Sequence, residues 1–148
     1  MTQALPENTQ SQVKTLLLEL QQDVADYRRL EGILLEQKAL LIQHDSDGLQ
    51  QLNQKQEPLL AQLAQRAASR SQLLQKLGFQ ADDKGMEKLL KKLPSSVNVK
   101  ATQLWQELHQ LLQRCQAHNN WNGRLLAGQM ELIHSLLQIP QGYPEPDR

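Results

Sequence analysis

The longest helical pattern in the chain runs from Ala101 to Ile139 and reads ATQLWQELHQLLQRCQAHNNWNGRLLAGQMELIHSLLQI. Apolar residues recur in it at spacings of three and four, which places their side chains on one face of an α-helix. This stripe contains Leu104, Leu108, Leu111, Leu112 and Cys115 in the first half, and Leu126, Met130, Ile133 and Leu137 in the second. The stretch therefore predicts one long amphipathic helix.

The middle of this helix is predicted to be its weakest part. Asn119 and Asn122 fall on the apolar stripe, and Gly123 and Gly128 follow them. Asparagine and glycine are poor helix formers, so we expect a hinge or a register-setting element between Asn119 and Gly128. The two asparagines either bind the backbone of a partner or pair with each other or a neighbouring helix. We favour the structural role, because polar residues in an apolar seam often fix helix register.

Beyond this hinge the helix carries more apolar surface than one neighbouring helix needs. The residues that widen the apolar face are Leu132, Ile133, Leu136, Leu137 and Ile139. This surplus predicts a docking surface for a partner.

A second long helix is predicted from Gln10 to about His44. Its main apolar stripe comprises Val13, Leu16, Leu17, Leu20, Val24, Tyr27, Leu34, Leu41 and Ile42. Another apolar line, on a different side, comprises Leu30, Ile33 and Leu40. Because a helix with two apolar sides contacts two neighbours, the sequence predicts a bundle of at least three helices. Glu31 and Lys38 fall on the main stripe, and we interpret them as partly exposed boundary positions rather than a functional ion pair.

A third long helix should follow a turn over residues 45–48 that supplies a helix cap. Its stripe comprises Leu49, Leu52, Leu59, Leu60, Leu63, Ala67, Leu74 and Leu77, with Gln56 and Arg70 set into it. Pro58 is expected to bend this helix near Gln54 to Glu57 without starting a new element. Gly78 should end it in the left-handed conformation, with Phe79 folding back over the last turn.

A short helix is predicted next, capped by Asp82 or Asp83 and ended by Pro94. Its apolar residues are Met86, Leu89, Leu90 and Leu93, and its lysines are Lys84, Lys88, Lys91 and Lys92. A phosphate-binding patch is one interpretation of the lysines, but the solvated face of a short amphipathic helix is favoured.

Taken together, these patterns predict an all-α fold: an elongated antiparallel helical bundle, or coiled coil, of three long helices plus one short helix. The chain has 148 residues and only 3% aromatic residues, which suits a leucine-rich helical core. We expect a disordered N-terminal end over residues 1–9, a helical bundle domain over residues 10–139 and a mobile proline-rich tail over residues 140–148.

Composition argues against several classes of partner. Sixteen basic and sixteen acidic residues give a formal net charge of zero, which disfavours nucleic acid and anionic membranes as partners. The sequence has no secretion signal at its start and no apolar run long enough for stable membrane insertion, so we expect a cytoplasmic protein.

The sequence offers no set of converging catalytic groups, so we expect no enzymatic activity and no cofactor. Cys115 is the only cysteine, and its place on the apolar stripe predicts a buried, unreactive thiol. Cys115 and His118 share a helix face, but a structural zinc site needs four ligands, so we predict no metal site.

Several local motifs resemble those of the FlgN family of flagellar type III export chaperones. The first two are Glu57-x-Leu59-Leu60 and Leu77-Gly78. The third is Asn119-x-x-Asn122-Gly123, which comes after Trp105 and Cys115. The resemblance extends from about Val13 to Ile139. Pro58, between Glu57 and Leu59, departs from the family pattern and leaves the straightness of that helix open.

The resemblance implies a cytoplasmic chaperone that binds the C-terminal helices of hook-filament junction proteins. Such a chaperone prevents their premature assembly and delivers them to the flagellar export apparatus. It also implies that the C-terminal amphipathic region binds the client. The residues expected to do so here are Leu125, Leu126, Met130, Leu132, Ile133, Leu136, Leu137, Ile139 and Tyr143. Formation of a homodimer through the same helix is a further expectation.

Three other functions remain open at this point. A coiled-coil structural adaptor or regulator would bind its partner along the N-terminal helix, from Val13 to Ile42. A helical RNA-binding protein would use Lys84 to Lys92, although net neutrality and scarce aromatic residues disfavour it. An enzyme with metal ligands on its helices is the least favoured.

Overall fold

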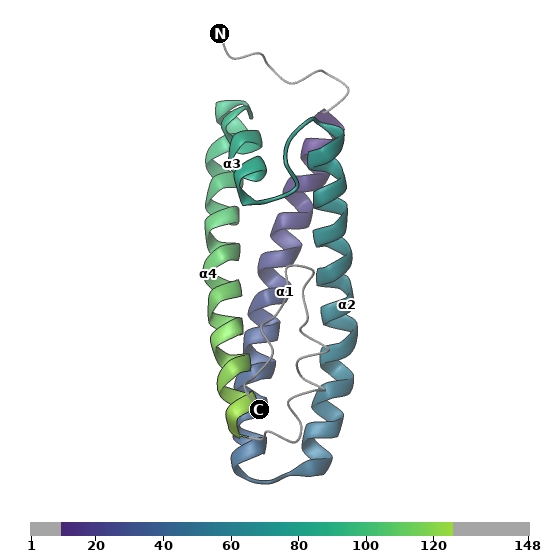
Figure 1. The fold of residues 1–148 in the computed structure, drawn as a ribbon, viewed down its shortest axis with the longest axis vertical. Helices are drawn as coiled ribbons and strands as arrows, with labels where there is room; N and C mark the ends of the chain where they lie inside the picture. The colour runs from purple at the N-terminus through teal and green to yellow at the C-terminus, as the bar shows by residue number, and fades with distance from the viewer. Residues whose placement is uncertain (1–9, 126–148) are drawn as a thin grey trace.

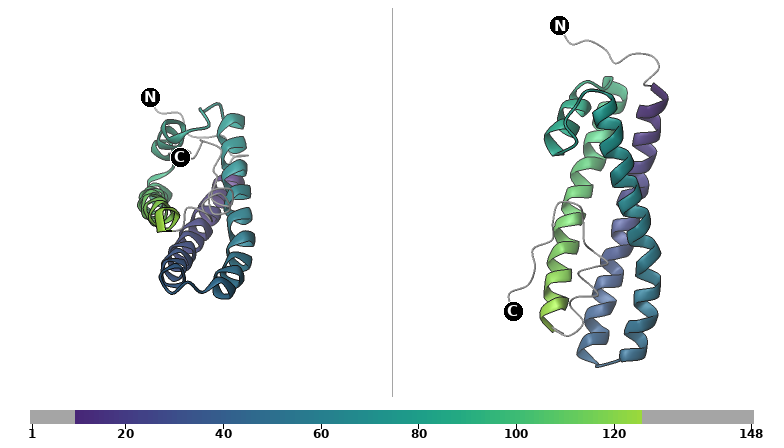
Figure 2. Two further views of the ribbon diagram at one scale, coloured as in Figure 1. Left: turned by 60° about the horizontal axis from the view of Figure 1, so that its bottom comes forward. Right: turned by 45° about the vertical axis from the view of Figure 1, so that its right-hand side comes forward.

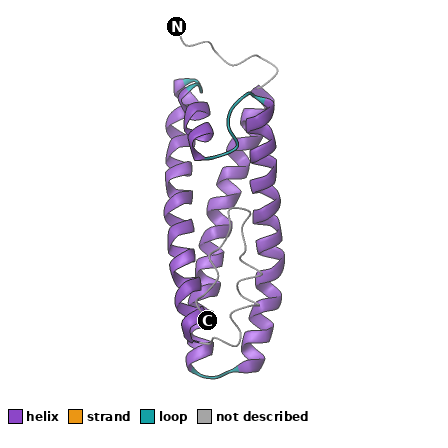
Figure 3. Ribbon diagram, in the orientation of Figure 1, coloured by secondary structure: helices purple, strands orange, loops and turns teal. Residues whose placement is uncertain are grey.

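The structure is a computed structural model that describes residues 10–125 (Figure 1). Four helices make up this part of the chain: α1 (Gln10–Ile42), α2 (Ser46–Lys76), α3 (Asp83–Lys91) and α4 (Ser95–Leu125). Between residues 10 and 125 only turns and short loops join them, and no strand occurs (Figure 3). The predicted all-α bundle of three long helices and one short helix is confirmed.

The three long helices lie side by side, with α1 between the other two (Figures 1 and 2). Successive long helices are antiparallel, so α4 runs in the same direction as α1. Helix α1 contacts both α2 and α4, as its two apolar sides predicted. No Cα atom of α2 lies within 8 Å of a Cα atom of α4. We call the end with the α1–α2 turn the lower end, and the end that carries α3 the upper end.

The turns that join the helices follow the predicted chemistry. Asp45 caps α2, because its Oδ1 accepts a hydrogen bond from the Gly48 N–H at 2.9 Å. A side chain at position 48 would collide with Asp45, since a Cβ atom there would lie 2.7 Å from the carboxylate. Helix α2 continues through Pro58, which therefore starts no new element. Gly78 follows it with φ of 87°, the left-handed stop that was predicted.

Helix α3 closes the upper end of the bundle. Asp82 caps it by accepting a hydrogen bond from the Gly85 N–H at 2.8 Å. Its apolar face is buried, and its four predicted lysines are exposed, as expected of a solvated face. Helix α3 contacts both α2 and α4, so its leucines lie between two helices whose backbones stay apart.

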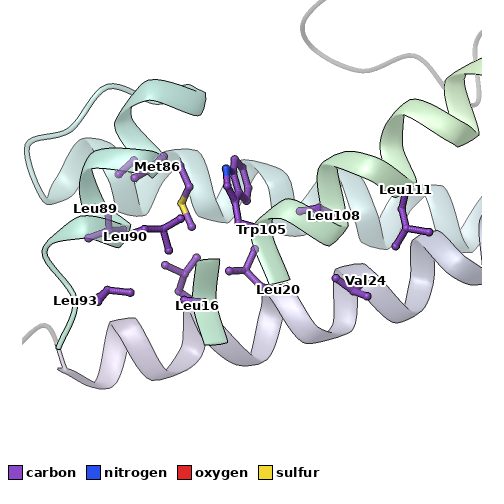
Figure 4. Close-up of a cluster of buried hydrophobic side chains, with 12 residues drawn as sticks. Leu16, Leu20, Val24, Met86, Leu89, Leu90, Leu93, Trp105, Leu108 and Leu111 are labelled. Carbon is purple, nitrogen blue, oxygen red and sulfur yellow. The ribbon is translucent and has the colours of Figure 1, made fainter. Parts of the chain in front are cut away.

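The main core lies at this upper end. In Figure 4, Met86 of α3 points into the space between Leu16 of α1 and Trp105 of α4. The complete cluster of buried residues is Leu16, Leu20, Val24, Leu74, Met86, Leu89, Leu90, Leu93, Ala101, Trp105, Leu108 and Leu111. We call it the upper cluster. Phe79 packs against it from the turn after α2, as predicted.

A charged layer lies between α1 and α2, beside the lower part of the upper cluster. The Asp23 carboxylate accepts hydrogen bonds from Arg66 Nε at 2.5 Å and from Arg70 Nη1 at 2.7 Å. Asp26 also pairs with Arg66, and the Arg70 guanidinium carbon lies 5.4 Å from the centre of the Trp105 ring. The Asp23 side chain is only 2% exposed, so this layer is a buried ion network. We call it the ionic layer.

Candidate partner-binding site

Below the ionic layer the core is smaller. The lower cluster comprises Leu30, Leu34, Leu59, Leu63 and Cys115. The Cys115 thiol donates a hydrogen bond to the Tyr27 carbonyl oxygen over 3.6 Å. Burial, assisted by the nearby Glu31 carboxylate, raises the pKa of Cys115 to about 12. Because the thiolate is the reactive form, this cysteine is a structural thiol, as its place on the stripe predicted.

A polar layer follows the lower cluster toward the lower end of the bundle. Its buried side chains are Gln37 of α1, Gln56 of α2, and Asn119 and Asn122 of α4. The Asn122 amide nitrogen donates to the Leu34 carbonyl oxygen at 2.8 Å and to Gln37 Oε1 at 2.9 Å. Asn122 thus pairs with a neighbouring helix, which is one of the arrangements expected for a structural role.

The predicted hinge lies partly inside the described part of the chain. Helix α4 continues without interruption through Asn119, Asn122 and Gly123, and all three residues are buried. Gly128 lies outside the described residues. The hinge and register roles of these four residues therefore stay predictions.

Ion pairs join α1 and α4 along their outer seam. Arg28 pairs with Glu107, and Glu31 accepts hydrogen bonds from Arg114 Nε at 2.8 Å and Nη2 at 3.2 Å. His118 Nε2 lies 3.2 Å from the same Glu31 carboxylate. The hydrogen bond from Arg114 is the main reason that the pKa of Glu31 is lowered. The sequence predicted that Glu31 is a partly exposed boundary residue rather than part of a functional ion pair. In the structure Glu31 is half-buried and pairs with Arg114 and His118 of α4.

The same seam becomes apolar at the lower end. Four large side chains are exposed there by 42–60%: Leu35, Ile42, Trp121 and Leu125. We call them the end patch. Lys38 lies among them, with its ammonium nitrogen 5.0 Å from the centre of the Trp121 ring. Leu35, Lys38 and Ile42 share one side of α1, and Trp121 and Leu125 are one turn apart on α4. The end patch therefore places exposed apolar side chains of α1 and α4 on either side of the Lys38 contact with Trp121.

Only one of the predicted partner-binding residues lies within the described part of the chain. Leu125 belongs to the end patch and is 42% exposed. The other eight, Leu126, Met130, Leu132, Ile133, Leu136, Leu137, Ile139 and Tyr143, lie outside the described residues. They begin directly after Leu125, so the predicted segment starts at the end patch.

Sequence reasoning missed the other members of the end patch. Ile42 was assigned to the buried stripe of α1, whereas it is 60% exposed. Leu35 and Trp121 were assigned to no surface. A signal was present, because Leu35 and Ile42 are seven residues apart and thus share a helix face away from Leu34.

The described part of the chain shows neither a metal-ligand cluster nor a membrane-spanning helix. Residues 10–125 contain no cluster of three or more metal-ligating side chains. Cys115 and His118 instead contact the Tyr27 carbonyl oxygen and the Glu31 carboxylate, respectively. None of the four helices is both long and apolar enough to cross a membrane.

Comparison with known proteins identifies the family. The family model described as FlgN protein matches residues 2–147. The chain belongs to the FlgN family. A crystal structure of a flagella synthesis protein FlgN from Pseudomonas aeruginosa is similar, with a TM-score of 0.72 and 26% sequence identity. The match covers 89% of this chain and 99% of the Pseudomonas chain. A comparison with curated proteins gave no match.

Family membership and the shared fold place the protein in flagellar biogenesis. The resemblance inferred from the leucine, tryptophan and asparagine positions is thereby confirmed. Family membership indicates flagellar proteins as its partners.

Proposed function

We propose that the protein is a cytoplasmic export chaperone for hook-filament junction proteins. It binds their C-terminal amphipathic helices, prevents premature assembly and delivers the clients to the flagellar type III export gate. The observation that carries the proposal is the end patch, together with the apolar segment that begins directly after it. FlgN family membership supports the choice of client.

The end patch by itself is too small for stable binding. Full burial of a large apolar side chain contributes about 1.5–3 kcal/mol, and the four side chains of the patch are already about half-buried, which leaves roughly 3–6 kcal/mol. The loss of rigid-body freedom on association costs about 4–15 kcal/mol. A client helix must therefore contact additional apolar surface.

The segment after Leu125 supplies that surface. Burial of Leu132, Ile133, Leu136, Leu137 and Ile139 would contribute about 8–15 kcal/mol more. After the cost of association, the sum corresponds to an affinity around the micromolar range or better. Such an affinity suits a carrier that must release its client at the export gate.

The chain offers a matched pair of variants for testing this proposal. The first combines Leu35→Asp on α1 with Leu125→Asp on α4. The second combines Leu18→Asp on α1 with Val99→Asp on α4, at sites that are more exposed, 59% and 60% against 49% for Leu35 and 42% for Leu125, and that lie outside the end patch. Loss of two apolar contacts should weaken binding of a C-terminal client helix by roughly 100-fold in the first variant. Isothermal titration calorimetry measures this affinity.

The control variant should bind the client helix as the wild-type chain does. Equal affinity of both variants and wild type would contradict the proposal. A loss of binding confined to the Leu18→Asp and Val99→Asp variant would favour an adaptor that binds along the outer face of α1. Clients bound by the wild-type chain should also stay monomeric in sedimentation experiments.

A further inference from the structure

Lys38 differs from the other partly buried basic residues of the described chain. Among residues 10–125 the lysine and arginine residues are exposed, except for Lys38, Arg66 and Arg70, which are half-buried. Arg66 and Arg70 both bind the Asp23 carboxylate. Lys38 pairs with no carboxylate in this part of the chain. Because charges removed from water are normally paired, Lys38 is positioned to bind a carboxylate from elsewhere.

The carboxylates near Lys38 on the outer seam do not neutralise it. Glu31 lies on the same side of α1, two turns before Lys38, but Arg114 already donates two hydrogen bonds to it. Glu36 lies two residues before Lys38, and is therefore about 200° around the helix from it. Arg124 adds an exposed cation near the end of α4. This part of the seam therefore carries an excess of positive charge, although the whole chain is neutral.

Lys38 lies in line with apolar side chains of the end patch. Leu35 precedes it by three residues and Ile42 follows it by four, at about 4.5 Å and about 6 Å along the axis of α1. The three residues share one side of the helix within about 60°. The Lys38 ammonium nitrogen is 5.0 Å from the centre of the Trp121 ring. A molecule that covers Trp121 and these side chains therefore also meets the ammonium group.

We propose that the end patch binds an amphipathic helix with a carboxylate inside its apolar stripe, and that this carboxylate pairs with Lys38. The pairing rests on the proposed function, because the client is the helix that binds, and it adds the charge that the client carries. Apolar residues three or four positions from the carboxylate cover Leu35 and Ile42. A wholly apolar stripe would remove Lys38 from water without pairing it, so the patch selects an acidic helix.

The experiment titrates the full-length chain with a peptide that spans the C-terminal helix of a hook-filament junction protein. Lys38→Met keeps most of the aliphatic stem but removes the charge, so the affinity should fall roughly 10- to 100-fold. Lys38→Glu brings two like charges together, so the affinity should fall further. Isothermal titration calorimetry measures both variants beside the wild-type chain.

A charge swap tests whether the contact is direct. A second peptide carries lysine in place of the acidic residue in its apolar stripe. It should bind the Lys38→Glu chain at least roughly tenfold more tightly than it binds wild type. Lys100→Glu is the matched control, because it makes the same change in net charge at an exposed site of α4. Lys100 lies about 32 Å along α4 from Trp121, which is several screening lengths at physiological salt, so this variant should bind both peptides as wild type does.

The outcomes separate this pairing from the proposed function. Full affinity of Lys38→Met and Lys38→Glu for the first peptide would overturn the pairing and leave the proposed function standing. Absence of binding by the wild-type chain would overturn both. Equal losses in Lys38→Glu and Lys100→Glu would assign the effect to net charge, and would also overturn the pairing.

Two other occupants of the end patch give different results. If a carboxylate of residues 126–148 pairs with Lys38, Lys38→Met should lower the melting temperature of the free chain and leave its affinity for the peptide unchanged. If a second copy of the chain covers the patch, wild type should show a dimer mass in sedimentation that Lys38→Glu loses. Either result would overturn the pairing with the client.

Discussion

The end of the bundle that carries α3 and the end that carries the α1–α2 turn bury their helices in different ways. At the upper end, twelve apolar residues from all four helices and the α3–α4 loop form one cluster. At the lower end, five residues form the lower cluster, and a layer of buried amides follows it. Four large apolar side chains then remain exposed in the end patch. The ionic layer lies between α1 and α2 beside the lower part of the upper cluster.

The difference suits the upper end to stabilising the bundle and the lower end to binding a partner. The upper cluster is closed by α3 and has its apolar groups covered, so it can hold the long helices together by itself. At the lower end apolar side chains are exposed, and the amide atoms of Gln56 have no hydrogen-bond partner among residues 10–125. Both features lower local stability. A region of low local stability next to exposed apolar surface is suited to binding a partner, because it can rearrange without unfolding the upper end.

The largest effect on stability is expected from removal of the Asp23 carboxylate from the ionic layer. Asp23→Ala leaves Arg70 beside Trp105 without its carboxylate, and leaves Arg66 with Asp26 alone. Breaking a buried ion network from one side costs about 3–5 kcal/mol, so the free energy of unfolding should fall by that amount. Urea denaturation followed by circular dichroism measures it.

Two further variants sharpen this result. Arg29→Ala removes only a 3.7 Å pair with Asp26 whose arginine side chain is 70% exposed, so its effect should be far smaller. Replacing Asp23, Arg66 and Arg70 together by leucine, methionine and leucine should restore most of the lost stability. A loss in the triple variant as large as in Asp23→Ala would show that the network contributes more than its own desolvation cost.

A smaller effect is expected in the polar layer. Asn122→Leu leaves Gln37 Oε1 and the second acceptor site of the Leu34 carbonyl without their donor. The free energy of unfolding should therefore fall by about 1–3 kcal/mol. Thiol labelling of Cys115, buried in the neighbouring lower cluster, should become faster if this loss opens the lower end. In a Trp121→Phe background, the fluorescence of Trp105 should report no change at the upper end.

The matched control is the pair Asn122→Leu with Gln37→Leu. Because both partners are then apolar, the pair should be more stable than Asn122→Leu alone. A double-mutant cycle isolates the coupling between the two amides. Independent, additive effects would mean that the Asn122 bond to Gln37 does not hold α4 in register against α1.

The sequence predicted the helices well because leucine periodicity reports burial directly. The bounds of α1, the turn at Asp45 and the stop at Gly78 all follow from residues within a few positions of each other. The ionic layer did not follow, because Asp23 and Arg66 meet only once the register between two helices is set. The apolar pattern of each helix does not reveal the register between α1 and α2.

The end patch was missed for a related reason. Ile42 extends the apolar stripe of α1 by one residue, but a step of about 100° turns it from the core toward solvent. Trp121 looks like a core residue by type, and only its neighbours on α1 decide that it stays half-exposed. The predicted binding residues beyond Leu125 lie outside the described residues, so their role stays a prediction.

The smallest expected effect concerns the outer seam of α1 and α4, just above the end patch. The pKa of Glu31 in the folded chain lies below its ordinary value of 4.5, chiefly because Arg114 donates a hydrogen bond to it. The stability supplied by this pair is therefore present above about pH 4.5, and is lost as the pH falls through the lowered folded-state pKa. Glu31→Gln should be less stable than wild type near neutral pH, and the difference should shrink in acid.

Thermal denaturation from about pH 7 to about pH 3 checks this prediction. Arg28 and Glu107 form a similar pair higher on the same seam, so Glu107→Gln is the natural comparison. If Glu31 holds the lower part of α4 on α1, only Glu31→Gln should speed labelling of Cys115, because Cys115 packs on α1 one helical position from Arg114. A stability difference that stays constant across this pH range would mean that the Glu31 carboxylate contributes through packing rather than through its charge.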